Sequence, residues 1–125
     1  MAPSSITELS IRQLVDNFYA RVRADPLLSP VFEEKLAGKW NMHMPKMYAF
    51  WTKVLLGTGE FQGNVFSKHM VLTGIEQRHF VHWLRLFKMT AIDIFGVEDA
   101  AVPLLVAERI AASLQLGYFG KAKVV

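Results

Sequence analysis

The chain has 125 residues, a length that suits one domain with a core of its own. Hydrophobic residues make up 52% and aromatic residues 12%, which predicts a very full core or a large apolar ligand inside the protein. The absence of cysteine excludes disulfides, thiolate zinc sites and iron–sulfur clusters. The net charge is +3, and because Lys and Arg are scattered over every segment, we expect no nucleic-acid partner.

The start of the chain, MAPSSITELS, lacks the basic and apolar regions of a signal peptide. Apolar runs also stay shorter than the roughly 20 residues that a membrane span needs. We therefore expect a cytoplasmic protein with no membrane partner.

Apolar residues at helical spacing predict a first helix that begins with an S-x-x-Q capping box at Ser10. Residues 3–9 are expected to add a partial turn at most. The helix should end near Asp25, because Pro26 restricts the residue before it, and residues 26–32 predict a short, tight helical turn. The predicted inward face of the helix comprises Ile11, Leu14, Val15, Phe18, Tyr19 and Val22.

A second long helix is predicted over residues 40–56. A proline such as Pro45 is tolerated in the first turn, where backbone N–H groups lack helical partners. We therefore expect regular helix to start close to residues 41–44, with His43 in or just before the first turn. The predicted apolar face comprises Trp40, Met44, Met47, Trp51, Val54 and Leu55.

The second half of the chain predicts a loop, a short helical segment and two further helices. Glycines mark a loop over 57–63, and residues 65–72 predict a very short helix. A capping box from Thr73 to Glu76 predicts the start of the clearest helix, which Gly96 ends. A last helix should run from about residue 98 to Gly117. The expected inward residues are Phe80, Trp83, Leu84, Phe87, Ala91, Ile94 and Phe95, then Val102, Leu105, Val106, Ile110 and Leu114. We find no strand pattern, so the sequence predicts an all-α fold in one domain over residues 1–125.

The histidines are the candidate metal-ligating residues. Glu76 and His79 form one E-x-x-H motif, but a di-iron site needs two, so they are interpreted as a capping glutamate and a surface histidine. A metal shared by His79 and His82 is a weaker alternative. His69 lies just before a helix cap and is followed by apolar residues, which suits an iron-binding imidazole or an ordinary structural histidine.

The joint spacing of aromatic residues and histidines is more specific than any single motif. It comprises Phe18 and Tyr19, the P-x-F turn ending at Phe32, His43 eight residues before Trp51, SKHMVL around His69 and HWLRLF around Trp83. In this spacing the chain resembles the truncated haemoglobins, and among them the third group, over about residues 10–116. The resemblance implies a two-over-two globin sandwich of helices that encloses a non-covalent haem b.

The resemblance also implies residue roles. His69 matches the proximal iron ligand, and the distal residues that stabilise the gas ligand match Tyr19, His43 and Trp83. The haem-contacting positions match Phe32, Met47 and Trp51. Lys68 and Arg78 flank the ligand segment and are candidates to meet the haem propionates, or are simply solvated.

Dioxygen on ferrous iron develops negative charge, which hydrogen-bond donors in a dry pocket stabilise. Three such donors predict binding of oxygen, nitric oxide and carbon monoxide with slow release. This favours nitric oxide detoxification or peroxide reduction, with a redox partner that the sequence does not identify. The alternatives are a haem-based gas sensor or carrier without catalysis, and a haem-free helical interaction module. Since Pro45 disturbs its helix near His43, we expect His43 to act as a mobile gate.

Overall fold

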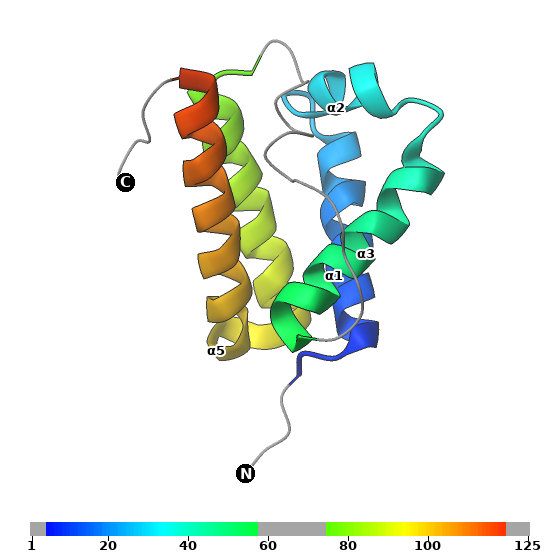
Figure 1. Cartoon of the computed structure of the whole chain (residues 1–125), viewed down its shortest axis with the longest axis vertical. Helices are drawn as coiled ribbons and strands as arrows, with labels where there is room; N and C mark the ends of the chain where they lie inside the picture. The colour runs from blue at the N-terminus through cyan, green and yellow to red at the C-terminus, as the bar shows by residue number, and fades with distance from the viewer. Residues whose placement is uncertain (1–4, 58–74, 120–125) are drawn as a thin grey trace.

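The computed structural model describes residues 5–57 and 75–119, and all regular structure within these ranges is helical, as predicted. α1 (Glu8–Ala24) packs against α2 (Ser29–Leu36), α3 (Trp40–Leu56) and α5 (Gln77–Phe119). α1 and α3 cross on one side of the molecule, and the two arms of α5 stand side by side on the other (Figure 1). Within the described ranges, no helix is both long and apolar enough to span a membrane.

The N-terminus of α1 lies earlier than the sequence predicted. Thr7 is the N-cap residue, and its hydroxyl accepts a hydrogen bond from the Ser10 N–H at 3.1 Å, while the Ser10 hydroxyl accepts from the Thr7 N–H at 2.8 Å. Ser10 is therefore the third helical residue, and a serine takes the place of the usual glutamate or glutamine in the capping box. The helix ends at Ala24 with Asp25 as C-cap, as expected before Pro26.

The predicted tight turn over residues 26–32 is too short. A turn does follow Asp25, whose carboxylate accepts hydrogen bonds from the Leu27 and Leu28 N–H groups at 3.0 and 2.9 Å. It leads into the eight residues of α2, with Pro30 in the first turn, where a proline costs little.

α3 occupies the predicted range, but it begins at Trp40, and Pro45 is its sixth residue and lies inside the helix, not in the first turn as predicted. The His43 N–H donates to the Lys39 carbonyl at 3.1 Å, which places His43 in the first turn as expected. Proline has no N–H, so the Asn41 carbonyl receives no helical bond from residue 45.

α5 consists of two helical arms that meet at Gly96, the predicted stop. Gly96 has φ 84° and ψ 166°, a backbone conformation that residues with a Cβ rarely adopt. The sequence offers two glycines that can end the second arm, Gly117 and Gly120, and the helix continues past the first of them to Phe119. At its other end α5 begins at Gln77. Glu76, predicted to lie in the first turn as part of a capping box, instead precedes the helix. Thr73, the other residue of that predicted box, lies outside the described residues.

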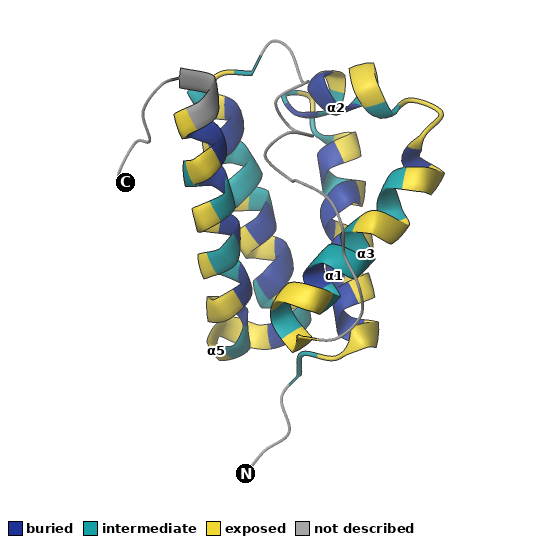
Figure 2. Cartoon of the chain, in the orientation of Figure 1, coloured by how far each residue is buried: buried dark blue, intermediate teal, exposed yellow. Residues whose placement is uncertain are grey.

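The core lies where α1 faces both α3 and α5, and the buried faces point inward on every helix (Figure 2). All six predicted inward residues of α1 are buried. Three predictions were wrong, because Val54, Val102 and Leu105 are 40%, 58% and 46% exposed. In the second arm, the predicted Leu114 is buried, and the other buried positions are Ala100, Pro103, Ala107, Ala111 and Gln115. Small residues there let the helix approach its neighbours closely, and the larger valine and leucine face outward.

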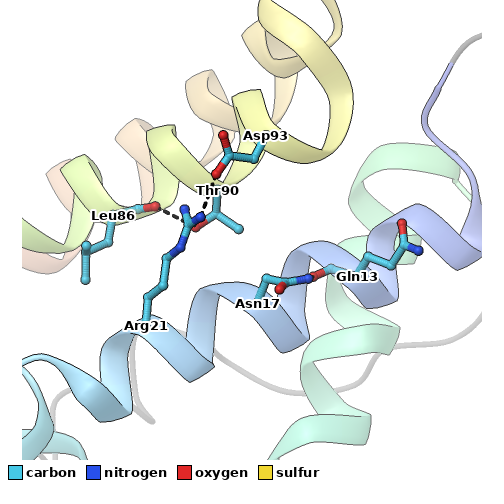
Figure 3. A network of polar contacts seen from close by, with 6 residues as sticks. All are labelled: Gln13, Asn17, Arg21, Leu86, Thr90 and Asp93. Atoms are coloured by element: carbon cyan, nitrogen blue, oxygen red, sulfur yellow. Dashed lines mark hydrogen bonds and ion pairs between the residues drawn. The ribbon is translucent and has the colours of Figure 1, made fainter.

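A polar network ties α1 to the first arm of α5 (Figure 3). The Arg21 guanidinium donates to the Thr90 hydroxyl at 2.9 Å and to the Asp93 carboxylate at 2.5 Å. The Thr90 hydroxyl, which is fully buried, in turn donates to the Leu86 carbonyl at 2.7 Å. The network fixes how α1 sits on the arm that carries Trp83.

Candidate functional site

Tyr19 is the centre of an aromatic cluster that joins α1, α2 and α3. Its side chain is only 5% exposed. The centroid of its ring lies 5.2 Å from that of His43, 5.7 Å from that of Trp40 and 6.2 Å from that of Phe32, all with edge-to-face geometry. The structure therefore brings together two of the predicted donors, Tyr19 and His43, with the predicted wall residue Phe32 beside them.

Burial sets the chemistry of the Tyr19 phenol. Removal from water disfavours the phenolate and raises the pKa of Tyr19 far above its ordinary value. The group is thus a neutral O–H donor throughout the physiological pH range. The Nε2 atom of His43 is also buried, so both polar groups lie in apolar surroundings where hydrogen bonds to charge are strong.

Trp83, the third predicted donor, connects to this cluster through Phe18. The ring centroid of Phe18 lies 5.1 Å from that of Tyr19 and 5.7 Å from that of Trp83. Trp83 also stacks on Phe87, with centroids 6.0 Å apart, and Phe87 stacks on Trp51 at 5.1 Å. Trp51 is therefore a buried core residue on α3.

Large apolar side chains on α3 and α5 remain half-buried around this cluster. They include Met44, Met47, Phe50 and Leu55 on α3 and Leu84, Val106 and Ile110 on α5. Met47, a predicted wall residue, lies one helical turn after His43 and so on the same side of α3.

The predicted iron ligand His69 and its neighbour Lys68 lie outside the described residues. Arg78 is described, and its guanidinium forms an exposed ion pair with the Glu76 carboxylate at 3.1 Å.

His79 is not the surface histidine that the sequence predicted. It is 6% exposed, and its Nδ1 atom accepts a hydrogen bond from the Glu76 N–H at 2.9 Å. The imidazole thus caps the start of α5 and takes the part that the sequence analysis gave to a glutamate. Its position three residues after Glu76 was the available signal.

His82 forms a contact that the sequence analysis missed. Its Nε2 atom lies 2.5 Å from Oδ1 of Asp25, so the contact joins the first arm of α5 to the end of α1. Burial alone would raise the pKa of Asp25, but the bonds from His82 and from the Leu27 and Leu28 N–H groups outweigh it and lower the pKa. Within the described ranges, no cluster of three potential ligands gathers around His79 or His82, which gives no support to a metal there.

Trp40 is the second residue that the sequence analysis left out of the site. It lies one helical turn before His43, and the two ring centroids are 5.8 Å apart. The indole N–H donates to the Glu33 carboxylate at 3.0 Å, and the Arg23 guanidinium lies 4.6 Å above the ring. Its three-residue spacing from His43 was the signal that could have found it.

Comparison with known proteins identifies the family and the fold of the chain. The family described as bacterial-like globin matches residues 7–107. The group 3 truncated hemoglobin ctb of Campylobacter jejuni is 33% identical over 114 residues, which cover 89% of this chain and 90% of that protein. The crystal structure of a group III truncated hemoglobin from Campylobacter jejuni superposes with a TM-score of 0.87 at 31% identity, covering 98% of this chain and 100% of that one.

The chain therefore belongs to the bacterial-like globins, a class of haem proteins that bind diatomic gases, and within them to the group III truncated haemoglobins. The predicted fold, the truncated two-over-two globin sandwich, is confirmed by the structural match. Family membership also argues against the haem-free interaction module.

Proposed function

We propose that this globin holds haem b through His69 and keeps a diatomic ligand in place for redox chemistry, above all nitric oxide detoxification. The observation that supports the proposal is the buried contact between Tyr19 and His43, whose ring centroids lie 5.2 Å apart. Neutral donors in apolar surroundings, next to half-buried methionine and aromatic side chains, fit a flat apolar cofactor with a polar ligand on one face.

Bound haem would supply a ferrous iron able to bind and polarise a diatomic gas. Tyr19 would offer its phenol O–H to the negative charge on that ligand, and Trp83 its indole N–H. Because Tyr19 is buried and its pKa raised, it stays a donor at physiological pH. Each such bond to a charged acceptor is worth about 1–3 kcal/mol. Together the donors slow ligand release and leave time for reaction.

His43 serves in this proposal as a mobile gate as well as a donor. It lies in the first turn of α3, and Pro45 leaves the Asn41 carbonyl without its usual helical bond, which loosens this part of the helix. Structures with and without a haem ligand should therefore show two His43 rotamers. A single, identical rotamer in both would contradict the gate.

The walls of the site and the carboxylate contacts complete the proposal. Phe32 and Met47 pack on the cofactor, with Trp51 behind them in the core. Arg78 is the first candidate for a haem propionate, because its exposed pair with Glu76 is of the kind that contributes little and exchanges readily. Lys68 is the second candidate for a propionate contact.

Nitric oxide consumption tests the reaction. Reduced, oxygenated protein is mixed with nitric oxide while nitrate and the oxidation of the iron are measured, with His69→Ala and free haemin as controls. We expect rapid, stoichiometric nitrate formation by the wild type and a much slower reaction in both controls. Tight gas binding without nitrate formation above the haemin control would contradict the proposal and favour a sensor or carrier.

A further inference from the structure

An exposed edge of α3 carries Lys46 and Lys53, and Lys39 is the N-cap residue of the same helix; we call these three residues the lysine stripe. They are spaced seven apart, and seven residues make almost two full turns of an α-helix. All three are exposed. The spacing therefore puts Lys46 and Lys53 in one row along α3, with Lys39 at its start, and makes this edge cationic.

The lysine stripe accounts for the net charge of the whole chain. The sequence contains 14 Lys and Arg against 11 Asp and Glu, a net charge of +3, and residues 37–57 contain three lysines and no Asp, Glu or Arg. Residues 37–57 thus carry three positive charges that no acidic residue of the same segment balances. Complementary charge makes this edge attractive to an acidic partner.

The lysine stripe runs close to the proposed haem site. His43, four residues after Lys39 and three before Lys46, borders the stripe and contacts Tyr19. Trp51, farther round the helix, is buried against Phe87. An α-helix with its side chains is about 10 Å across. A protein seated on the lysine stripe would therefore lie within about one helix width of His43, a distance that suits electron transfer to a group held beside it.

We propose that the lysine stripe docks an acidic one-electron carrier protein, with a flavin or an iron–sulfur cluster, that reduces the ferric haem. The inference rests on the proposed function, since redox turnover leaves the iron ferric and consumes electrons. One electron passes from the carrier to ferric iron, which becomes ferrous; the carrier is oxidised by one electron, and no proton moves or covalent bond changes.

The composition of the stripe favours a carboxylate-rich protein over a nucleic acid. Arginine, the residue type best shaped to bind phosphate with two hydrogen bonds, is absent from residues 37–57. Met42, three residues after Lys39 and four before Lys46, is 67% exposed on the same face. An exposed methionine suits a protein interface, where methionine is enriched, and the lysines around it suit a charged rim.

Charge reversal tests the proposal. The stripe variant combines Lys39→Glu, Lys46→Glu and Lys53→Glu. The matched control combines Arg85→Glu, Lys88→Glu and Arg109→Glu, which changes the net charge equally at exposed positions of α5. Reduction of each haem-loaded protein by a reduced acidic [2Fe–2S] ferredoxin is followed by stopped flow at low and high salt, with hexaammineruthenium(II) as a small, cationic donor.

We expect the rate with ferredoxin at low salt to fall by about 10-fold or more in the stripe variant, and much less in the control. High salt should remove the difference, and the small donor should reduce all three proteins without a preference for the wild type. Equal losses in both variants, or none in the stripe variant, would overturn the proposal.

Carbodiimide cross-linking, which joins lysines to carboxylates, gives a second readout that does not depend on haem. Mass spectrometry of the ferredoxin adduct, made with and without haem, should find cross-links at the stripe lysines. Cross-links confined to other lysines would overturn the proposal, as would tighter binding of a single-stranded oligonucleotide than of ferredoxin at the stripe. A protein that binds no haem but still cross-links at the stripe would contradict the proposed function and not the docking surface.

Discussion

Removing the Tyr19 hydroxyl isolates the effect of one donor. Tyr19→Phe retains the ring that lies 5.1 Å from Phe18, 5.7 Å from Trp40 and 5.2 Å from His43 between centroids. The aromatic cluster should keep its packing, because the ring and its edge-to-face contacts are unchanged. The free energy of unfolding is therefore expected to stay close to that of the wild type.

The expected loss of oxygen affinity in Tyr19→Phe follows from the burial of Tyr19. With only 5% of the residue exposed, water cannot easily replace the lost O–H donor. A hydrogen bond to a charged acceptor in such a site is worth about 1–3 kcal/mol, which corresponds to a factor of about 5–150 in affinity. Since mutations mostly change dissociation, the oxygen dissociation rate should rise by a factor in this range.

Stopped-flow displacement of oxygen by carbon monoxide measures that rate. Tyr48→Phe is the matched control, because it also removes one phenol hydroxyl, which donates to the exposed Asp16 carboxylate. We expect Tyr48→Phe to leave oxygen release unchanged. Equal dissociation rates in wild type and Tyr19→Phe would refute the role of Tyr19 as a donor.

Three further predictions concern the frame around the site. Thr90→Val keeps the shape of a fully buried residue but removes the hydroxyl that accepts a hydrogen bond from Arg21. The free energy of unfolding, measured in urea, should therefore fall by about 1 kcal/mol. An unchanged value would mean that this hydrogen bond contributes nothing to stability. Because the pKa of Asp25 is lowered by its bonds to His82 and two N–H groups, its contribution to stability is complete above the unfolded pKa of about 3.9 and is lost as pH falls through the folded pKa. Asp25→Asn should therefore be less stable than the wild type at pH 7, with the gap closing below about pH 4; a gap that stays constant with pH would contradict this. In Gly96→Ala the added Cβ has no atom within 4 Å, but it stands on a backbone with φ 84° that residues with a Cβ rarely adopt. The substitution should therefore lower the free energy of unfolding by about 1–3 kcal/mol, measured by thermal unfolding. An unchanged unfolding midpoint would show that the backbone at the kink adapts.

The sequence predicted the long helices well because their signals are local. Helical spacing located the buried face of α1, Pro26 its end, and Gly96 the kink between the arms of α5. The second arm was harder, since Val102 and Leu105 carry the stronger hydrophobic signal and yet face outward. The buried face of the second arm consists largely of alanines. A search for large apolar residues at helical spacing overlooks alanine and therefore misses this face.

Contacts between distant residues set the limit of prediction at the site. The contact between Tyr19 and His43 followed the spacing of a known family, whereas the pair of Asp25 and His82 joins residues 57 positions apart and leaves no local pattern. His79 was misjudged for a related reason. A histidine at the start of a helix is usually solvated, and only the fold shows that Nδ1 accepts from a backbone N–H.

Haem ligation by His69 is the central claim, and a haemin titration followed in the Soret region tests it most directly. Wild type, His69→Ala and His43→Ala are titrated side by side, the last as a variant that loses an imidazole from the proposed distal side. We predict a Soret band of a bound histidine-ligated haem in wild type and His43→Ala, and its loss or clear alteration in His69→Ala. An unaltered band in His69→Ala would contradict the claim, and so would a wild-type protein that ignores haemin.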